Sequence, residues 1–321
     1  MKALRPTLFD DAKKSHASQN LAVQIAMFAV VFFVILLAES AIPGIMSIGP
    51  MKEELEKSGY LENGTFTFAE SMSTATKVAS MPKIMIPSLF STVFGTLISI
   101  LYVRAFEMRK VCSMGAVRRR AVPHYLLGIA VGLLMMTSIT LLTVVTGVNG
   151  IKVNSDINYG LITLYLGGFL IQGMSEEFIF RGYLMTTVGA SHNTWIAIGI
   201  SAAAFGLAHA ANPGFTLFTF FNLALFGAFA SLYMILFEDI WGVCAIHSVW
   251  NFAQGNIYGI SVSGSGDTES VLRTTAISDK TLLTGGKFGI EGSISTTTVL
   301  GVGIAVLLVI MYKRPQNTDS E

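Results

Sequence analysis

The sequence predicts an all-α membrane protein that crosses the bilayer several times. Of its 321 residues, 52% are hydrophobic and only 13% are charged, and the mean hydropathy is +0.61. Soluble domains carry about 25% charged residues, so the deficit indicates burial in lipid. The apolar residues also fall into runs near the roughly 20 residues that a membrane-spanning helix needs.

Eight apolar stretches are expected to be spans. Their approximate limits are 21–41, 84–103, 125–148, 159–188, 194–211, 215–237, 240–258 and 295–312. The first could be mistaken for a signal peptide because basic residues precede it. Its apolar run is longer than the usual ~7–15 residues of such a peptide, so we expect an uncleaved anchor. The fourth span is unusual because it contains two glutamates and an arginine.

The distribution of lysine and arginine predicts the orientation. These residues gather in segments 1–20 and 104–123 and in the tail that begins at Lys313. Because cytoplasmic loops carry an excess of Lys and Arg, both termini and the 104–123 loop are expected to be cytoplasmic. The protein is then a multi-pass protein, expected in the plasma membrane.

Two longer loops, 42–83 and 259–294, are expected on the outer side as solvated connectors. The first contains Asn63-Gly64-Thr65, which fits a glycosylation acceptor. The net charge of +1 gives no reason to expect a nucleic-acid partner. Cys112 and Cys244 form neither a disulfide framework nor a zinc-ligand spacing.

The expected organisation has four parts and no soluble domain. They are a cytoplasmic tail (1–20), a two-span N-terminal region (21–123), a membrane core (124–260, with its motif-bearing part at 157–258), and a final part with the outer loop, the last span and a cytoplasmic tail (261–321).

Polar residues interrupt three of the apolar spans as short motifs. The motifs are Glu176-Glu177-Phe178-Ile179-Phe180-Arg181, Phe205-Gly206-Leu207-Ala208-His209 and His247-Ser248-Val249-Trp250-Asn251. Ionisable groups inside membrane helices are rare, usually face the protein interior and indicate function. Carboxylate, imidazole and amide groups are also the types that can activate water and position it.

Helical spacing suggests how the motif residues divide their roles. Glu177 and Arg181 are four positions apart with the acid first, which favours a pair. Glu176 points about 100° away from that face, which leaves it free for chemistry. Phe205 shares a face with His209. His247 and Asn251 share another, and neither has an obvious charge partner in the sequence.

The distances along the helices predict that the first two motifs lie at the same height in the membrane. A turn at 189–193 joins spans four and five, and at 1.5 Å per residue Glu176 and His209 lie about 22–27 Å from it. His247 reaches the same height only if span four is long. The helix break at 211–214 follows His209 directly, and we expect it to be embedded and to line a cavity.

These groups together predict hydrolysis. Glu176 could take a proton from water, and His209 could share that task. His247 and Asn251 could hold the oxyanion of a tetrahedral intermediate. Alternatively, Glu176, His209 and His247 could bind zinc. We expect no tightly bound metal, because the three residues lie on separate helices without the close ligand pair of common zinc proteases.

In this order, the motifs EExxxR, FxxxH and HxxxN resemble the CPBP family of intramembrane endopeptidases. That family includes CAAX prenyl proteases and bacteriocin-processing or immunity-related proteins, and the resemblance covers about 157–258. It implies cleavage near the cytoplasmic face of a membrane-associated, possibly lipidated protein or peptide. It also implies that Glu176 and His209 activate water and that His247 and Asn251 bind the oxyanion. Glu177 and Arg181 then have supporting roles, as does Phe205.

Two other kinds of function remain open at this point. An ion-coupled transporter would place the Glu and His residues along a proton path and would show two related halves. No such halves are evident. A non-catalytic scaffold or immunity protein would bind a partner through the same cavity and would keep working when Glu176 is replaced.

Overall fold

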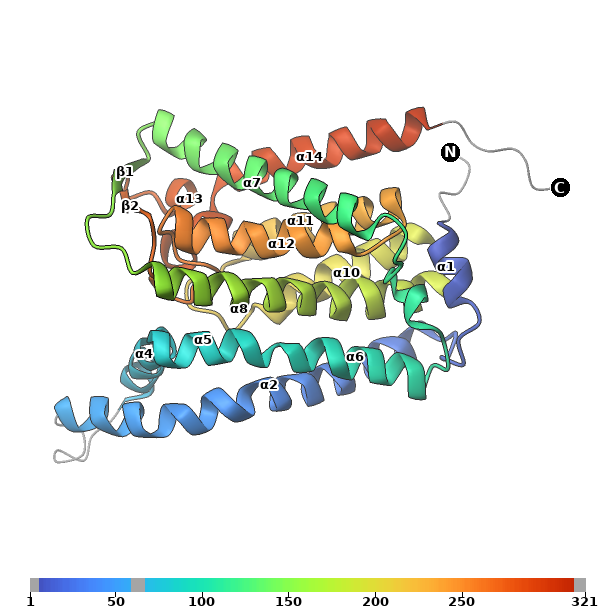
Figure 1. Cartoon of the computed structure of the whole chain (residues 1–321), viewed down its shortest axis with the longest axis horizontal. Coiled ribbons are helices and arrows are strands. Elements are labelled where there is room, and N and C mark those ends of the chain that lie inside the picture. The colour runs from blue at the N-terminus through green and yellow to red at the C-terminus, as the bar shows by residue number, and fades with distance from the viewer. Residues whose placement is uncertain (1–5, 59–66, 315–321) are drawn as a thin grey trace.

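The computed structural model describes residues 6–58 and 67–314. Within them, long helices run back and forth along one axis and pack side by side (Figure 1). Helices dominate and the strands are short, so the predicted all-α class is confirmed. The predicted glycosylation motif Asn63-Gly64-Thr65 lies outside the described residues.

The elements follow the order of the chain. The first half contains α1 (Thr7–Ala12), α2 (Leu21–Lys57), α4 (Phe68–Ala79), α5 (Pro82–Ser91), α6 (Val93–Ala105), the short η1 (Val111–Met114), α7 (Ala121–Val145) and strand β1 (Asn149–Val153). The second half contains α8 (Tyr159–Glu177), the π-helical η2 (Phe178–Met185), α9 (Thr186–Ser191), α10 (Thr194–Ala208), α11 (Leu217–Phe237), α12 (Trp241–Phe252), the π-helical η3 (Ala253–Ile257), β2 (Leu272–Ala276), α13 (Thr281–Thr284), η4 (Gly286–Phe288), η5 (Ile290–Gly292) and α14 (Ile294–Lys313).

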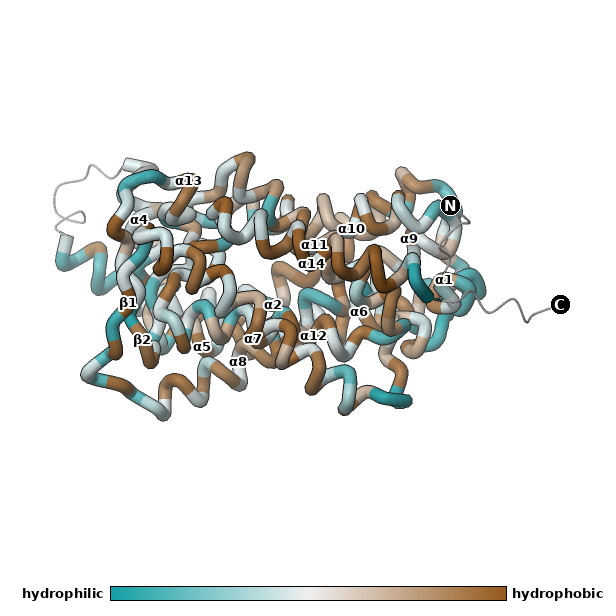
Figure 2. Tube along the Cα trace, turned by 90° about the horizontal axis from the view of Figure 1, so that it is seen from above, coloured by the Kyte–Doolittle hydropathy of each residue, from teal (hydrophilic) through white to brown (hydrophobic). Residues whose placement is uncertain are grey.

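Each of the eight expected spans coincides with a helix or with consecutive helices. Among the described residues, five segments are long and apolar enough to cross a membrane: α2, α5 together with α6, α7, α11 and α14. Helix α10 is apolar but shorter. Figure 2 shows many hydrophobic residues along the middle of the bundle and hydrophilic ones gathered toward its two ends. The spans that carry the motifs are therefore the less apolar or shorter ones.

The outward faces of the peripheral helices are apolar, as expected for contact with lipid. Phe33 on α2 is 61% exposed, Leu134 on α7 is 68% exposed and Val302 on α14 is 60% exposed. Helix α12 lies inside the bundle instead, where it packs against α7 and α8. All its residues from Gly242 to Asn251 are buried. The central position of α12 brings the third motif to the middle of the protein.

The 42–83 loop was predicted as a solvated connector, and this prediction is wrong for most of its length. Helix α2 continues to Lys57 although it contains Pro43 and Pro50. Pairs four positions apart, such as Lys57 with Glu53 at 2.7 Å, support its last turns. Helix α4 then packs back onto α2 and α5, and Lys77 pairs with Glu54. This local pairing of charges makes the connector helical.

The second predicted connector, 259–294, is also folded against the bundle. Strands β1 and β2 pair antiparallel, with Ile151 opposite Thr274. Phe288 and Ile290 are fully buried, and Ser293 caps α14 by accepting a bond from the backbone N–H of Thr296. Short apolar and hydroxyl-bearing stretches in this Gly/Ser/Thr-rich segment therefore cover one end of the helices. We call this end, formed by the last turns of α2 with α4, β1, β2 and α13, the loop end.

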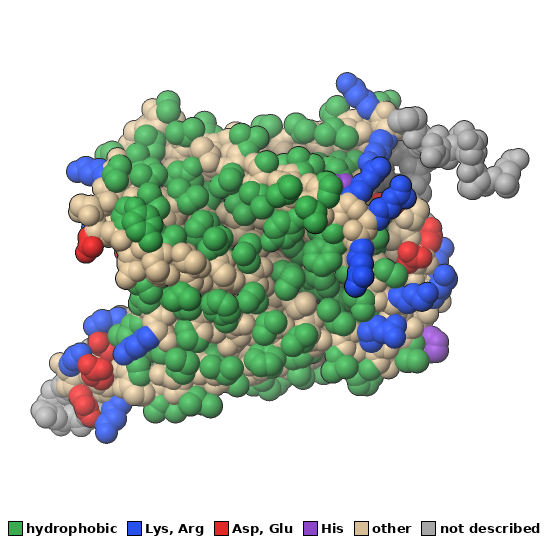
Figure 3. Space-filling view, in the orientation of Figure 1, with side chains coloured by type: hydrophobic (Ala, Val, Ile, Leu, Met, Phe, Trp, Pro, Cys, Tyr) green, Lys and Arg blue, Asp and Glu red, His purple; other side chains and the backbone are tan. Residues whose placement is uncertain are grey.

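The opposite end, which we call the basic end, is formed by α1, the 106–120 loop, the α9–α10 turn and the last turn of α14 (Figure 1). Figure 3 shows a group of Lys and Arg side chains there. The exposed ones are Lys13, Lys14, Lys110, Arg118, Arg119, Arg120, Lys313 and Arg314. The segments predicted to share one side of the membrane thus lie at one end of the protein.

The segment 1–20 is more than a tail. Within it, α1 buries Leu8, Phe9 and Ala12, and it packs against α9. Gly189 of α9 makes this possible, because a Cβ there would lie 2.5 Å from the Phe9 ring. The amphipathic spacing of these apolar residues docks α1 onto the basic end.

Candidate active site

Three ionisable side chains from three helices face one point. The Oε2 atom of Glu176 on α8 is 3.9 Å from Nε2 of His209, which follows α10, and 3.9 Å from Nε2 of His247 on α12. Both distances exceed those of direct hydrogen bonds, and this oxygen of Glu176 is buried without a hydrogen-bond partner. The predicted equal height of Glu176 and His209 is confirmed by this distance.

Glu177 connects two buried partners behind this point. Its Oε1 accepts a hydrogen bond from Arg181 Nη1 at 3.0 Å, as the four-residue spacing predicted. The same oxygen accepts a bond from Nδ1 of His247 at 2.7 Å, which the sequence did not indicate. The side chains of Glu177 and Arg181 have no exposed surface, and that of His247 is 4% exposed. Glu177 therefore neutralises Arg181 and also orients the His247 imidazole.

Packing of small residues allows this close arrangement. Gly173 of α8 contacts α12 so closely that a Cβ would lie 2.5 Å from the backbone nitrogen of Ser248. Gly227 of α11 leaves room for Arg181, whose Nη2 would be 3.2 Å from a Cβ there. The guanidinium carbon of Arg181 also lies 4.7 Å from the centre of the Phe205 ring. Such stacking lowers the cost of burying the cation.

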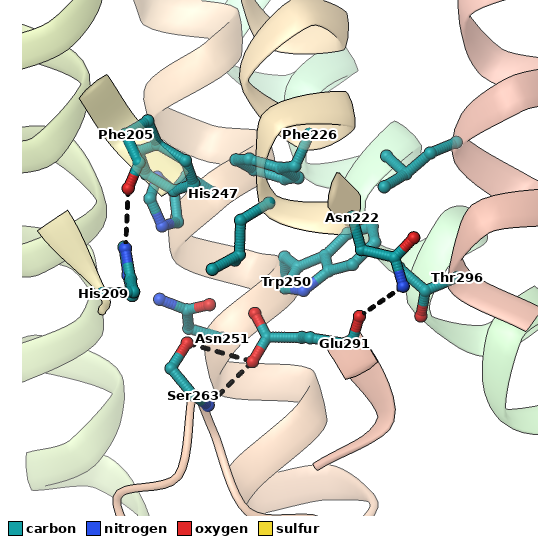
Figure 4. A pocket seen from close by; sticks show the side chains of 12 residues that line it. Phe205, His209, Asn222, Phe226, His247, Trp250, Asn251, Ser263, Glu291 and Thr296 are labelled. Atoms are coloured by element: carbon teal, nitrogen blue, oxygen red, sulfur yellow. Dashed lines mark hydrogen bonds between the residues drawn. The ribbon is translucent and has the colours of Figure 1, made fainter. Parts of the chain in front are cut away.

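His209 stands at the end of α10, where the helix stops. Its Nδ1 donates to the Phe205 carbonyl at 2.9 Å. A carbonyl can only accept, so this bond places the proton on Nδ1 and leaves Nε2 of the neutral imidazole toward Glu176. Phe205 thus contributes both its ring and its carbonyl to the site. Figure 4 shows His209, His247 and Asn251 around one small space.

Gln172 is a site residue that the sequence reasoning missed. Its side-chain amide donates to Oε1 of Glu176, and its carbonyl accepts a 2.8 Å bond from Nδ2 of Asn251. A polar residue in an apolar span, four positions before Glu176, was the available signal. Gln172 links the carboxylate of the first motif to the amide of the third, so all seven predicted site residues lie in one connected group.

A cavity of about 230 Å³ opens beside this group. Its polar wall is formed by Gln172, Glu176, His209 and Asn251, and the rest by α5 and two loops. Asn212 and Pro213 line it, so the helix break after α10 borders a cavity as predicted. Polar groups thus border an open cavity that a substrate segment can enter.

The 259–293 segment contributes a second missed network. Oε2 of Glu291 accepts bonds from the backbone nitrogen and the hydroxyl of Ser263, at 2.7 and 3.0 Å (Figure 4). It also accepts a bond from Nε2 of Gln254 at 3.1 Å. Asn222 of α11 donates to the carbonyls of Glu291 and Ser293 at 2.8 and 2.9 Å. These bonds fasten the segment over the site. No sequence signal identified Glu291, because its partners come from distant elements.

The described residues contain no group of three or more His, Cys, Asp or Glu side chains placed to hold a metal ion. Whether the protein needs a metal therefore stays a prediction.

Comparison with known proteins adds an independent observation. Residues 158–253 match the family model for type II CAAX prenyl endopeptidase Rce1-like proteins. The match runs from the first turn of α8 through α12 and contains every predicted site residue, although it covers less than a third of the chain. No curated protein matches the chain significantly. The matched segment contains the three motifs in order, and it supports an assignment to the CPBP/CAAX protease family.

Proposed function

We propose that the protein is an intramembrane endopeptidase that hydrolyses a peptide bond in a membrane-associated protein or peptide. The observation that carries the proposal is the placement of one oxygen of Glu176 at 3.9 Å from each of two imidazole nitrogens. A water molecule held among these groups has a base beside it. The substrate carbonyl then enters from the adjoining cavity.

Glu176 is the proposed general base. It removes a proton from the water as the oxygen attacks the peptide carbonyl, and it later delivers that proton to the leaving amine. His209 assists, because its unprotonated Nε2 accepts the second hydrogen bond of the water. The bond from its Nδ1 to Phe205 keeps this nitrogen free. The products are one carboxylic acid and one amine, so the water is fully accounted for.

His247 and Asn251 are the proposed oxyanion donors. Glu177 accepts the Nδ1 proton of His247, and it can balance the positive charge when Nε2 also carries a proton. Asn251 gives one amide hydrogen to Gln172, which leaves its second amide hydrogen for the oxyanion. Donors that are already in place when negative charge develops are worth most in a water-poor site. Arg181 supports the reaction indirectly by holding Glu177.

The decisive experiment is Glu176→Gln, which keeps the shape of the side chain but removes the base. We expect peptides with new termini in membranes that contain the wild-type protein, and none in membranes with the variant. Ser138→Ala is a matched control, because Ser138 lies outside the site and its hydroxyl bonds only its own helix at Leu134. Equal cleavage by Glu176→Gln and wild type would defeat the proposal.

The same experiment separates the alternatives. A scaffold or immunity protein would keep its effect on cells in the Glu176→Gln variant, whereas a peptidase would lose it. A metalloprotease would lose activity in a chelator and would release a stoichiometric metal when His247 is replaced by Ala. We expect wild-type activity to survive the chelator, with metal content measured on the same purified sample.

A further inference from the structure

A second and larger cavity lies next to the site. It has a volume of about 600 Å³ and is bounded by α2, α4 and α5. Five of its lining residues also line the cavity beside Glu176: Met85, Leu89, Pro213, Gly264 and Ser265. The two spaces therefore adjoin, and together they reach the size that is usual for ligand pockets. A chain that reaches Glu176 through the smaller cavity continues into the larger one.

The walls of this larger cavity are apolar or hydroxyl-bearing, with one exception. Glu39 of α2 is the only ionisable side chain among its lining residues. Within 6–58 and 67–314, no Lys, Arg or His lies within ion-pair distance of Glu39. This differs from Glu177, whose charge is matched by Arg181. An acidic group in a membrane-spanning region without an ionic partner is costly, and such groups usually mark a functional site.

Glu39 also lies close to the reacting groups. Oε1 of Glu39 and Oγ of Ser175 would lie 2.5 and 2.4 Å from a Cβ on Gly95. The absence of a side chain at Gly95 is therefore what lets α2 bring its carboxylate against the residue that precedes Glu176. A substrate held at Glu176 thus has a carboxyl group a short distance along its path.

We propose that the larger cavity binds the substrate segment beside the scissile bond and that Glu39 pairs with a cationic group of that segment. The group is a Lys or Arg side chain flanked by apolar residues, or a free N-terminal amine. The apolar walls contact the neighbouring side chains of the substrate, and the cation supplies the ionic partner that Glu39 lacks. This inference rests on the proposed peptidase function and adds a specificity to it.

The test uses the full-length protein in liposomes and labelled apolar peptides that differ at one position, Lys or norleucine. Each peptide is made with a free and with an acetylated N-terminus. Binding is measured in the Glu176→Gln background, so it does not depend on turnover. Cleavage is measured with Glu176 present. Glu39→Gln is the variant, and Ser47→Ala, which alters a polar lining residue without charge, is the matched control.

We expect the Lys peptide to bind at least about tenfold more tightly than the norleucine peptide, a difference of about 1.4 kcal/mol. Glu39→Gln should remove the preference, and Ser47→Ala should keep it. If acetylation abolishes tight binding of both peptides, the N-terminal amine is the recognised cation. If only the replacement of Lys by norleucine weakens binding, the Lys side chain is the recognised cation. In the cleavage assay, Glu39→Gln should raise KM for the Lys peptide. If Glu39 instead shares a proton with Glu176, the variant should lower kcat.

Binding that changes neither with the Lys-to-norleucine replacement nor with acetylation would overturn the inference, as would a preference for the cationic peptide that survives Glu39→Gln. Absence of binding by any of the peptides would overturn it too. These outcomes differ from failure of the proposed function, in which peptides bind through Glu39 but the wild-type protein cleaves none of them. Detergent melting of Glu39→Gln shows whether the variant is folded.

Discussion

Glu177 holds two buried partners, Arg181 and His247, through one oxygen. This makes it the centre of the polar core, since each partner would otherwise be a buried donor without an acceptor. Removing one member of a buried ion pair typically costs about 3–5 kcal/mol, because the other charge is left alone.

We therefore expect both Glu177→Ala and Arg181→Ala to lower the melting temperature in detergent strongly. The double variant should lose less stability than the sum of the two, because neither charge is then left without its partner. Glu177→Ala should also reduce activity more than Arg181→Ala, since only Glu177 contacts His247. Melts of the two single variants and the double variant measure the coupling. Additive losses would show that the pair does not exist.

Asn251 allows a second test at this scale. If its amide stabilises only the oxyanion, Asn251→Ala should lower kcat by about 10²–10³ with little change in KM. Gln172→Ala is the informative comparison, because it removes the partner that Asn251 has in the resting site. A rise in KM with unchanged kcat for Asn251→Ala would assign this amide to substrate binding instead.

At the scale of elements, contact between α8 and α12 determines whether the site exists. Gly173 lies where these helices are closest, and the neighbouring atom is backbone that cannot move aside. Two π-helical stretches, η2 and η3, follow α8 and α12 directly. Such stretches are often found at functional sites, because they shift the phase of the side chains beyond them.

We expect Gly173→Ala to destabilise the protein by about 1–3 kcal/mol through overpacking and to reduce activity as well. Gly199→Ala is the matched control: it lies in α10, and a Cβ there would meet nothing within 4 Å. Its expected effect is neutral or slightly stabilising, because Ala favours helix. The melting temperatures of the two variants in detergent, compared with that of the wild type, test this prediction. Equal effects would mean that the α8–α12 contact is looser than described.

At the scale of the whole molecule, the cavities are nearer to the loop end than to the basic end. Their walls come from α2 beyond Leu36, from α4 and α5, and from the loops at 212–213 and 262–265. The Lys and Arg bias predicts that the basic end lies in the cytoplasm. The family resemblance implies cleavage near the cytoplasmic face. In this structure the two expectations point to opposite sides of the membrane.

We expect the orientation predicted from the Lys and Arg bias, with the basic end in the cytoplasm. Cys112 is an exposed native thiol in the 106–120 loop of the basic end, and Cys244 is buried. An impermeant thiol reagent should therefore leave the wild-type protein unlabelled in intact cells and label it after lysis. Ser58→Cys, placed at the loop end, should be labelled in intact cells when Cys112 is replaced by Ser. The reverse pattern would turn the cavities toward the cytoplasm and would favour a cytoplasmic, lipidated substrate.

Features that depend on local spacing could be predicted from the sequence alone. Apolar runs located the helices, the four-residue spacing predicted the Glu177–Arg181 pair, and rise per residue matched the heights of Glu176 and His209. These follow from helix geometry, which is the same wherever the helix lies. The motif residues were also found from sequence alone, since charge in an apolar run is visible without a fold.

The contacts between helices, and the segment that covers their ends, could be seen only in the tertiary structure. The bond between Glu177 and His247 joins α8 to α12, Gln172 joins Glu176 to Asn251, and Glu291 fastens a segment predicted as a solvated connector. None of these contacts has a sequence period, because each depends on how closely glycines let separate elements approach. Glu39 shows the same limit: its place in the larger cavity, which adjoins the cavity beside Glu176, follows from the packing of α2 against α5 and α6.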